Sequence, residues 1–254
     1  MTNNLHIKEQ FNKQADKFNR WVVTRDEKIL ASLYDFAGIK NKDRLLDFAC
    51  GTGAFAAYAA QRAKFVQGVD ISEKMIEIAV ENAKHFQLSN IDFLCCDVEK
   101  VPFPDNSFQC VISKSAFHHM KNYQTVFAEM VRCCQKKGLI CIEDIITYDD
   151  KVLDQYFESL ECAIDISHNL SLPKLEIVNL YKHNGVKIFR LFESTSLLNF
   201  GDYVNHAVQT AEARERINTI LREGLQDSYI SPWFVTQNNI LFWKRKIITI
   251  VGEK

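Results

Sequence analysis

One stretch of the chain, residues 44–57 with the sequence RLLDFACGTGAFAA, limits the possible folds more than any other. Its apolar first half predicts a buried strand. Gly51 and Gly53 then allow the positive φ angles and the close backbone approach of a tight turn. The small residues that follow predict a helix, whose first N–H groups and positive dipole end attract polar ligand groups. The stretch therefore predicts a strand, a turn and a helix that together bind a nucleotide cofactor.

The residues around this turn distinguish two classes of adenine cofactor. Gly51, Gly53 and Ala56 satisfy the G-x-G-x-x-G/A pattern that holds a dinucleotide pyrophosphate against the start of a helix. Asp47, however, ends the strand four residues before Gly51. A carboxylate at that place repels a pyrophosphate and attracts an ammonium group. The turn therefore favours a cofactor that carries a positive charge.

Strand and helix patterns alternate over the first 147 residues. Apolar runs predict strands at residues 45–48, 65–70, 91–97, 108–113 and 138–146. Amphipathic runs predict helices at residues 25–37, 53–62, 72–86 and 122–134. Such alternation is typical of a mainly parallel sheet covered by helices on both faces, which binds ligands outside the carboxyl ends of its strands. Polar residues fall at or near those ends, namely Asp47, Asp70, Asp97, Ser113, Glu143 and Asp144.

The ordered motifs over residues 11–147 resemble those of the class I S-adenosylmethionine-dependent methyltransferases. They comprise Asp47-x-x-x-Gly51-x-Gly53, an acid that ends the second strand, an acid that follows the third, and SAFHHM after the fourth. SAFHHM is similar to the branch that C-methylates ubiquinone and menaquinone precursors. The resemblance implies an α/β fold with a doubly wound, seven-stranded, mainly parallel sheet. Its order would be 3-2-1-4-5-7-6, with the last strand antiparallel, in a single methyltransferase domain over residues 1–254.

The resemblance also implies roles for individual residues. Asp70 would bind the ribose hydroxyls, and Asp97 would accept a hydrogen bond from the adenine amino group. The segment FNKQADKFN resembles the family's opening that folds over the methionine end of the cofactor, so residues 1–23 are either a lid helix or an ordinary surface helix. Phe18 stands where a tyrosine is common and keeps only its packing role. The implied cofactor-binding residues are Asp47, Ala49, Gly51, Thr52, Gly53, Asp70, Ile71, Met75, Asp97, Val98, Ser113 and Phe18.

The second half of the chain predicts a helical cap over the acceptor site. Helical patterns cover residues 149–165, 173–183 and 205–225, the last with Val208 on its apolar face. Residues 186–193 and 240–251 read as strands, which in the resembling family form the last pair of the sheet. We therefore expect segments 149–185 and 198–236 to form the cap.

The sequence offers candidate catalytic residues without deciding between them. His119 follows the fourth strand and His168 lies in DISHNLS, where the acceptor is expected to approach; both are candidates, and a purely structural His118–His119 pair is the alternative. Glu143 or Asp144 could bind a cationic acceptor, although one of the two must face the helices. Four further residues could line the pocket or belong to the core, namely Tyr181, Tyr203, His206 and Trp233. Methyl transfer from a sulfonium requires no metal, and we expect none.

The absence of two motifs limits the class of acceptor molecule. Residues 113–116 read SKSA, whereas the resembling amide and adenine N-methyltransferases have Asn/Asp-Pro-Pro-Tyr/Phe at this place. The chain also lacks the Pro-Cys pair that supplies the nucleophile for cytosine C5 methylation. The net charge of −1 and the lack of a Lys/Arg tract argue against nucleic acid or an anionic membrane as partner. Lys244, Arg245 and Lys246 read as a solvated hairpin end. We expect a small organic acceptor; the acceptor atom and the oligomeric state stay open.

Length and cysteine content set the remaining limits. The chain has 254 residues, of which 47% are hydrophobic, which is enough for one substantial core. Its eight cysteines fall mostly inside apolar patterns and include no C-x-x-C, so we expect small buried side chains rather than a zinc site or disulfides. The N-terminus has no apolar signal region and no run of 18 apolar residues occurs, which favours a soluble, cytoplasmic protein.

Two other functions compete with methyl transfer. A short-chain NAD(P)-dependent oxidoreductase would need Tyr-x-x-x-Lys, but no tyrosine here has a lysine four residues later. A non-catalytic protein that only binds S-adenosylmethionine would be indicated by a damaged cofactor motif set, and this set is intact. Methyl transfer is therefore the favoured hypothesis.

Overall fold

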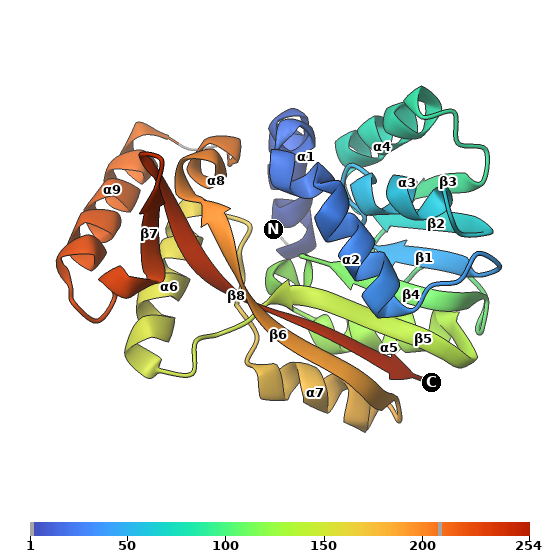
Figure 1. Ribbon diagram of the computed structural model, residues 1–254. Helices are drawn as coiled ribbons and strands as arrows, with labels where there is room; N and C mark the ends of the chain where they lie inside the picture. The colour runs from blue at the N-terminus through green and yellow to red at the C-terminus, as the bar shows by residue number, and fades with distance from the viewer. Residues whose placement is uncertain (1–2, 208–209) are drawn as a thin grey trace.

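The computed structural model describes residues 3–207 and 210–254, and in them one twisted sheet runs through the molecule (Figure 1). Its hydrogen-bonded order is β3-β2-β1-β4-β5-β8-β6, and a short β7 pairs with the far end of β8. β1 to β5 are parallel, whereas β8 is antiparallel to both β5 and β6. The strands are β1 Arg44–Phe48, β2 Phe65–Asp70, β3 Ile91–Cys95, β4 Phe108–Lys114, β5 Cys134–Ile145, β6 Lys187–Asn199, β7 Phe234–Gln237 and β8 Ile240–Glu253. The predicted fold class and strand order are confirmed, and β7 is an addition.

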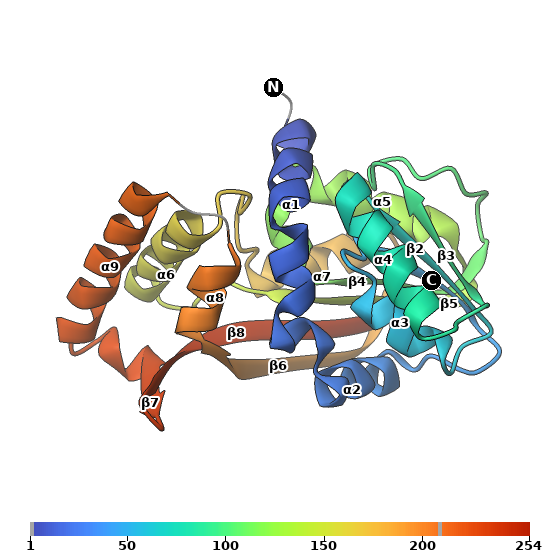
Figure 2. The ribbon, with the colours of Figure 1, turned by 90° about the horizontal axis from the view of Figure 1, so that it is seen from above.

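Helices cover both faces of the sheet (Figure 2). Successive strand residues point to opposite faces, so Leu45 packs with α2 and α3 while Leu46 packs with α5 and α7. The α-helices are α1 Asn3–Arg20, α2 Glu27–Ala37, α3 Ala54–Ala60, α4 Glu73–His85, α5 Tyr123–Cys133, α6 Lys151–Ile164, α7 Lys174–His183, α8 Phe200–His206 and α9 Ala211–Gln226. Short 3₁₀ helices are η1 Val22–Arg25, η2 Phe117–His119 and η3 Ser231–Trp233. No helix within the described ranges combines the length and apolar character that crossing a membrane requires.

Gly53 is a position where the fold depends on the absence of a side chain. Its φ is +74°, and a Cβ there would lie 2.9 Å from both Ala79 Cβ on α4 and Phe93 Cζ on β3. Gly53→Ala is expected to lower the free energy of unfolding by about 2 to 4 kcal/mol, because backbone strain and overpacking add. Urea unfolding measures this loss.

The matched control for that substitution is Gly185→Ala. Gly185 has a similar φ of +70°, but nothing lies within 4 Å of a Cβ built there, so the control carries only the backbone strain. A loss at Gly53 no larger than the loss at Gly185 would contradict the close packing of the turn against α4 and β3.

The cap half of the molecule has a hydrophobic core of its own. β6 and β8 extend beyond the end of β5 as a two-stranded ribbon, and α6, α8 and α9 pack around it (Figure 1). Trp243 is 1% exposed at the centre, and its ring stacks on Phe157 with centroids 5.2 Å apart. Its indole N–H donates to the Tyr148 hydroxyl. The ribbon therefore joins this second core to the main sheet.

Several predicted boundaries were wrong for local reasons. The helix expected over residues 205–225 is two helices, because α8 ends at His206 and the Thr210 hydroxyl caps the start of α9; Val208 lies outside the described residues. The first helix ends at Arg20 rather than at residue 23, because Trp21 has extended backbone angles. The third strand ends at Cys95, two residues early, and β6 continues to Asn199 rather than ending at residue 193.

Candidate cofactor and acceptor site

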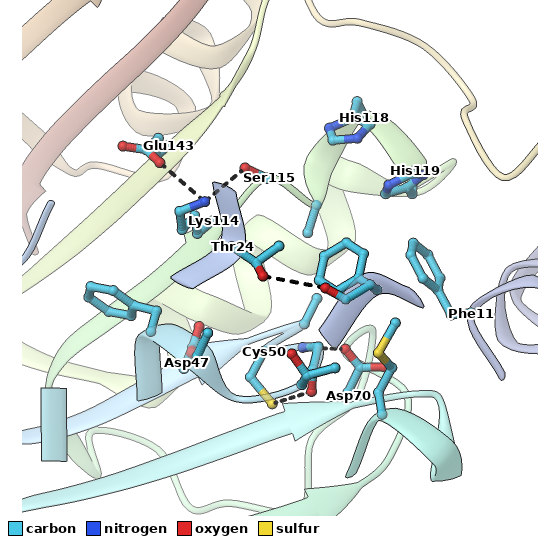
Figure 3. A pocket seen from close by; sticks show the side chains of 18 of the residues that line it. Phe11, Thr24, Asp47, Cys50, Asp70, Lys114, Ser115, His118, His119 and Glu143 are labelled. Atoms are coloured by element: carbon cyan, nitrogen blue, oxygen red, sulfur yellow. Dashed lines mark hydrogen bonds and ion pairs between the residues drawn. The ribbon is translucent and has the colours of Figure 1, made fainter. Parts of the chain in front are cut away.

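A cavity of about 240 Å³ opens at the carboxyl ends of the central strands, between the sheet, α1 and the cap (Figure 3). Most residues predicted to bind the cofactor line it, namely Asp47, Ala49, Gly51, Thr52, Asp70, Ile71, Met75, Asp97, Val98 and Phe18. Gly53 and Ser113 do not. Gly53 faces α4, and the Ser113 hydroxyl donates to the Phe48 carbonyl inside the sheet. These two residues therefore contact the elements around the cavity but do not line it.

Asp47 is a buried acid with one carboxyl oxygen that lacks a partner among the described residues. It is 2% exposed at the end of β1, and its Oδ2 has no hydrogen-bond partner in the described structure. Burial raises its pKa to about 8, with Lys114 opposing and Asp70 reinforcing that rise. Lys114 is itself paired with Glu143, at 3.7 Å. A buried, unpartnered carboxyl group is costly, so this position fits a cationic ligand group.

Asp70 is held in place by the glycine turn. The Gly51 N–H donates to its Oδ2 and the Ser72 N–H to its Oδ1, both at 2.9 Å. Burial raises the pKa of Asp70, although these backbone N–H groups counteract the rise. The carboxylate at the end of β2 is therefore fixed in direction, and its remaining lone pairs are available to hydroxyl groups.

Asp70→Ala is expected to weaken S-adenosylmethionine binding by about 1 to 3 kcal/mol, the typical cost of losing a charge-assisted hydrogen bond. Calorimetric titration measures the change. Asp92→Ala is the matched control, because Asp92 is an exposed acid on the neighbouring strand β3. An unchanged dissociation constant in Asp70→Ala would make the ribose assignment wrong.

The helix α1 lines the cavity, and hydrogen bonds join it to the segments that follow β2 and β3. The Asn4 amide donates to Asp97 Oδ2 at 2.7 Å, and the Asn12 side chain accepts from the Ser72 hydroxyl. Near the other end of the helix, Asn82 of α4 donates to both Asn19 and the Thr52 carbonyl. Phe11 and Phe18 of α1 face the cavity.

His118 forms a buried pair with Asp144 at the acceptor side. Its Nδ1 lies 2.5 Å from Asp144 Oδ1, while Asp144 Oδ2 accepts from the Ala116 and Phe117 N–H groups. Burial alone would raise the pKa of Asp144, but His118 and the Phe117 and Ile145 N–H groups hold it below its usual range. The carboxylate is therefore ionised and accepts from Nδ1–H. In neutral His118 this leaves Nε2 as a proton acceptor.

His119, the predicted candidate, lines the cavity beside His118 (Figure 3). Its Nδ1 donates to the Ser167 carbonyl at 3.1 Å. Burial and the neighbouring His118 lower the pKa of His119 to about 3, so it is neutral and a weak base. His168, the other candidate, does not line the cavity. It lies behind His118 and pairs with Glu158, with Nε2 and Oε1 2.7 Å apart.

An aromatic wall closes the cavity on the cap side. Trp21 stacks on His206 with centroids 4.2 Å apart and 7° between the rings, and Tyr203 lies alongside. Burial lowers the pKa of His206 to about 4, so this ring is neutral. Two other residues proposed as walls belong to hydrophobic clusters instead: Tyr181 is in the sheet core and Trp233 packs against the cap core.

The expectation of a solvated hairpin end at residues 244–246 was wrong for Arg245. Its side chain is 11% exposed, lines the cavity, and pairs with Glu161 at 2.7 Å. Alternation along the ribbon places Lys246 on the opposite face, but its side chain is also covered, at 13% exposed, and pairs with Asp149 at 2.6 Å. Lys114 was not identified from the sequence as a residue of the site. Its position directly after Ser113, at the end of the fourth strand, could have indicated that it lies at the cavity. The same alternation separates Glu143, which faces the cavity, from Asp144, which faces η2.

A mainly parallel sheet, a glycine turn beside a buried acid, and acids at neighbouring strand ends meet at this cavity. A family model described as a methyltransferase domain matches residues 46–142. This match, together with the fold, supports a class I S-adenosylmethionine-dependent methyltransferase.

Part of the chain is also similar in sequence to individual methyltransferases. The chain is 29% identical over 164 residues to the uncharacterized methyltransferase YcgJ of Bacillus subtilis, covering 62% of each chain. It is 27% identical over 143 residues to the demethylmenaquinone methyltransferase of a Geobacillus species, covering 54% of this chain and 61% of the relative. These matches thus span less than two thirds of either relative.

Solved structures share the fold. The crystal structure of YcgJ superposes with a TM-score of 0.80 at 22% identity, covering 89% of this chain and 97% of YcgJ. A geranyl diphosphate C-methyltransferase from Streptomyces coelicolor, crystallised with Mg²⁺, geranyl diphosphate and S-adenosylhomocysteine, superposes with a TM-score of 0.62 at 14% identity, covering 89% and 77%.

Proposed function

We propose that this protein transfers a methyl group from S-adenosylmethionine to a small organic acceptor. The observation that carries the proposal is the unpartnered Oδ2 of Asp47, buried beside the glycine turn. An ammonium group would complete it, whereas a pyrophosphate would be repelled. The donor set therefore fits the amino-acid end of S-adenosylmethionine rather than a dinucleotide.

Three acids would hold successive parts of the cofactor. Asp47 would bind the ammonium group, Asp70 the ribose hydroxyls, and Asp97 the adenine amino group. Asp97 Oδ2 already accepts from Asn4 and has a second lone pair for this contact. When bound, S-adenosylmethionine supplies a methyl group activated by the sulfonium charge. Much of the acceleration then comes from aligning the acceptor with that methyl group.

The acceptor would lie between η2 and the aromatic wall. His118 would accept a proton from it at Nε2, and Asp144 would orient the ring and stabilise the resulting imidazolium. Lys114 forms an ion pair with Glu143, and Arg245 forms one with Glu161. Each of these four charged groups on the acceptor side therefore has a partner of opposite charge. This arrangement suits an uncharged organic acceptor with an acidic X–H group, such as a phenol, a thiol or an activated carbon acid.

The proposed architecture is one domain with two covers. Residues 1–23 would act as a lid, since α1 is tied to both Asp97 and α4. Segments 149–185 and 198–236 would act as a cap that excludes water from the acceptor. We also propose a cytoplasmic location, because all eight cysteines are free thiols, as is usual in a reducing compartment.

Calorimetric titration with S-adenosylmethionine, S-adenosylhomocysteine and NAD tests the cofactor. Both sulfur compounds are expected to bind and NAD is not; NAD binding without a response to either sulfur compound would overturn the proposal. Formation of S-adenosylhomocysteine with a panel of phenols, thiols, carbon acids and amines then tests turnover. If both sulfur compounds bind but every acceptor fails, the non-catalytic binding protein becomes the better account.

A further inference from the structure

A trio of metal-binding side chains lies outside the cavity, on α6 and the loop that follows it. Glu158 and Cys162 are four residues apart, so they lie one above the other on the same face of the helix. The loop returns His168 to that face. One ligand atom from each residue lies within 4.8 Å of the other two.

We propose that Glu158, Cys162 and His168 bind a zinc ion, with water as the fourth ligand. A thiolate, an imidazole and a carboxylate together form a donor set typical of Zn²⁺, whereas Mg²⁺ prefers oxygen ligands alone. In a tetrahedral site neighbouring ligand atoms lie about 3.3 to 3.8 Å apart, given metal–ligand bonds of about 2.0 to 2.3 Å. A rotation of the Cys162 side chain that brings its sulfur about 1 Å closer, and a separation of His168 Nε2 from Glu158 Oε1 by about 0.6 Å, would give this geometry.

Two members of the trio are already held together, and the third is accessible. His168 Nε2 lies 2.7 Å from Glu158 Oε1, and the His168 side chain is 1% exposed. Cys162 is exposed, contrary to the expectation that the cysteines are mostly buried, so its thiol can be reached by an ion from solvent. Binding would release the Cys162 thiol proton, and the His168 Nε2 proton would move to Nδ1 or to solvent. Two metal bonds would then replace the His168–Glu158 hydrogen bond.

The position of the trio gives the metal a structural effect on the cavity. The loop at residues 165–172 contacts both cavity histidines, because the Ser167 carbonyl accepts from His119 while the Asn169 and Leu170 N–H groups donate to the His118 carbonyl. A metal that joins His168 to α6 would fix this loop. The sequence-based expectation of no metal rested on the sulfonium chemistry and on the absence of C-x-x-C, and neither bears on a Glu-x₃-Cys-x₅-His arrangement.

The test is a Co²⁺ titration of the untagged, chelator-treated protein, followed by absorption. One equivalent of Co²⁺ is expected to produce a thiolate-to-cobalt charge-transfer band, which added Zn²⁺ removes and Mg²⁺ leaves unchanged. Cys162→Ser is expected to lose the band. Cys95→Ser is the matched control and should keep it, because Cys95 is the other exposed cysteine.

A second readout covers the other ligands. Zn²⁺ is expected to raise the melting temperature of the wild-type protein but not that of Cys162→Ser. Glu158→Gln should weaken Zn²⁺ binding at least about tenfold, since it removes a charged ligand. Absence of a stoichiometric band, its persistence in Cys162→Ser, or its loss in Cys95→Ser would each overturn the proposal. Neither readout involves methyl transfer, so the zinc site and the proposed function can fail independently.

Discussion

Asp47→Asn is expected to abolish measurable S-adenosylmethionine binding and, at the same time, to stabilise the protein at pH 8. The binding loss follows because an amide cannot neutralise the cofactor's ammonium group. The gain in stability follows from burial. The folded-state pKa of Asp47 is about 8, well above its unfolded value of about 3.9, so folding favours the protonated form.

Because the pKa of Asp47 is higher in the folded state than in the unfolded state, the stability of the wild-type protein decreases as the pH rises. As pH rises from about 4 to about 8, the unfolded state loses the Asp47 proton while the folded state keeps it, and stability falls. Asparagine has no proton to lose. The advantage of Asp47→Asn should therefore be small at pH 4 and reach about 2 to 4 kcal/mol at pH 8.

Urea unfolding at pH 5 and pH 8 measures the stability difference, and calorimetry measures cofactor binding. Asp92→Asn is the control, since Asp92 is exposed on β3 and does not line the cavity. A variant that binds the cofactor as tightly as the wild type, or whose stability advantage does not grow with pH, would argue against the unpaired acid at the end of β1.

His118→Gln is expected to lower kcat by a factor of about 10² to 10⁴ for acceptors that must lose a proton, with cofactor affinity unchanged. Glutamine keeps a polar group at the cavity wall but cannot take the proton. Asp144→Asn should also lower kcat, because an amide no longer fixes the Nδ1–H tautomer of His118. Single-turnover methyl transfer from saturating S-adenosylmethionine measures the chemical step.

The control for that experiment is His183→Gln, because His183 is exposed at the end of α7, far from the site in sequence and outside the cavity lining. His119→Gln provides a sharper comparison and should lose less than His118→Gln, since His119 has a pKa of about 3 and is the weaker base. If the larger loss fell on His119, the assignment of the base to the His118–Asp144 pair would be wrong.

The sheet and the cofactor turn could be predicted because local signals determine them. Apolar runs and punctuating residues identified the first five strands, and the strand β2 was placed at its observed bounds, Phe65–Asp70. Ser72 caps the start of α4 and Gly38 ends α2, and both are residue types that favour those positions. Parallel strands bring their carboxyl ends to one edge, so the convergence of Asp47, Asp70 and Asp97 on one cavity followed from topology alone.

The acceptor side could not be predicted, because it depends on contacts between distant segments. Trp21 and His206 stack although 185 residues separate them, and Arg245 pairs with a glutamate from α6. From the sequence, His119 rather than His118 was the candidate catalytic residue. Only the three-dimensional arrangement, which places Asp144 against one ring and the Ser167 carbonyl against the other, distinguishes them.

A crystal structure with S-adenosylhomocysteine bound tests the central claim most directly. We predict the amino group of the ligand within hydrogen-bond distance of Asp47 Oδ2, the ribose hydroxyls on Asp70, and the adenine amino group on Asp97. Electron density for the ligand at another place, or a bound ligand that none of these three carboxylates touches, would contradict the account.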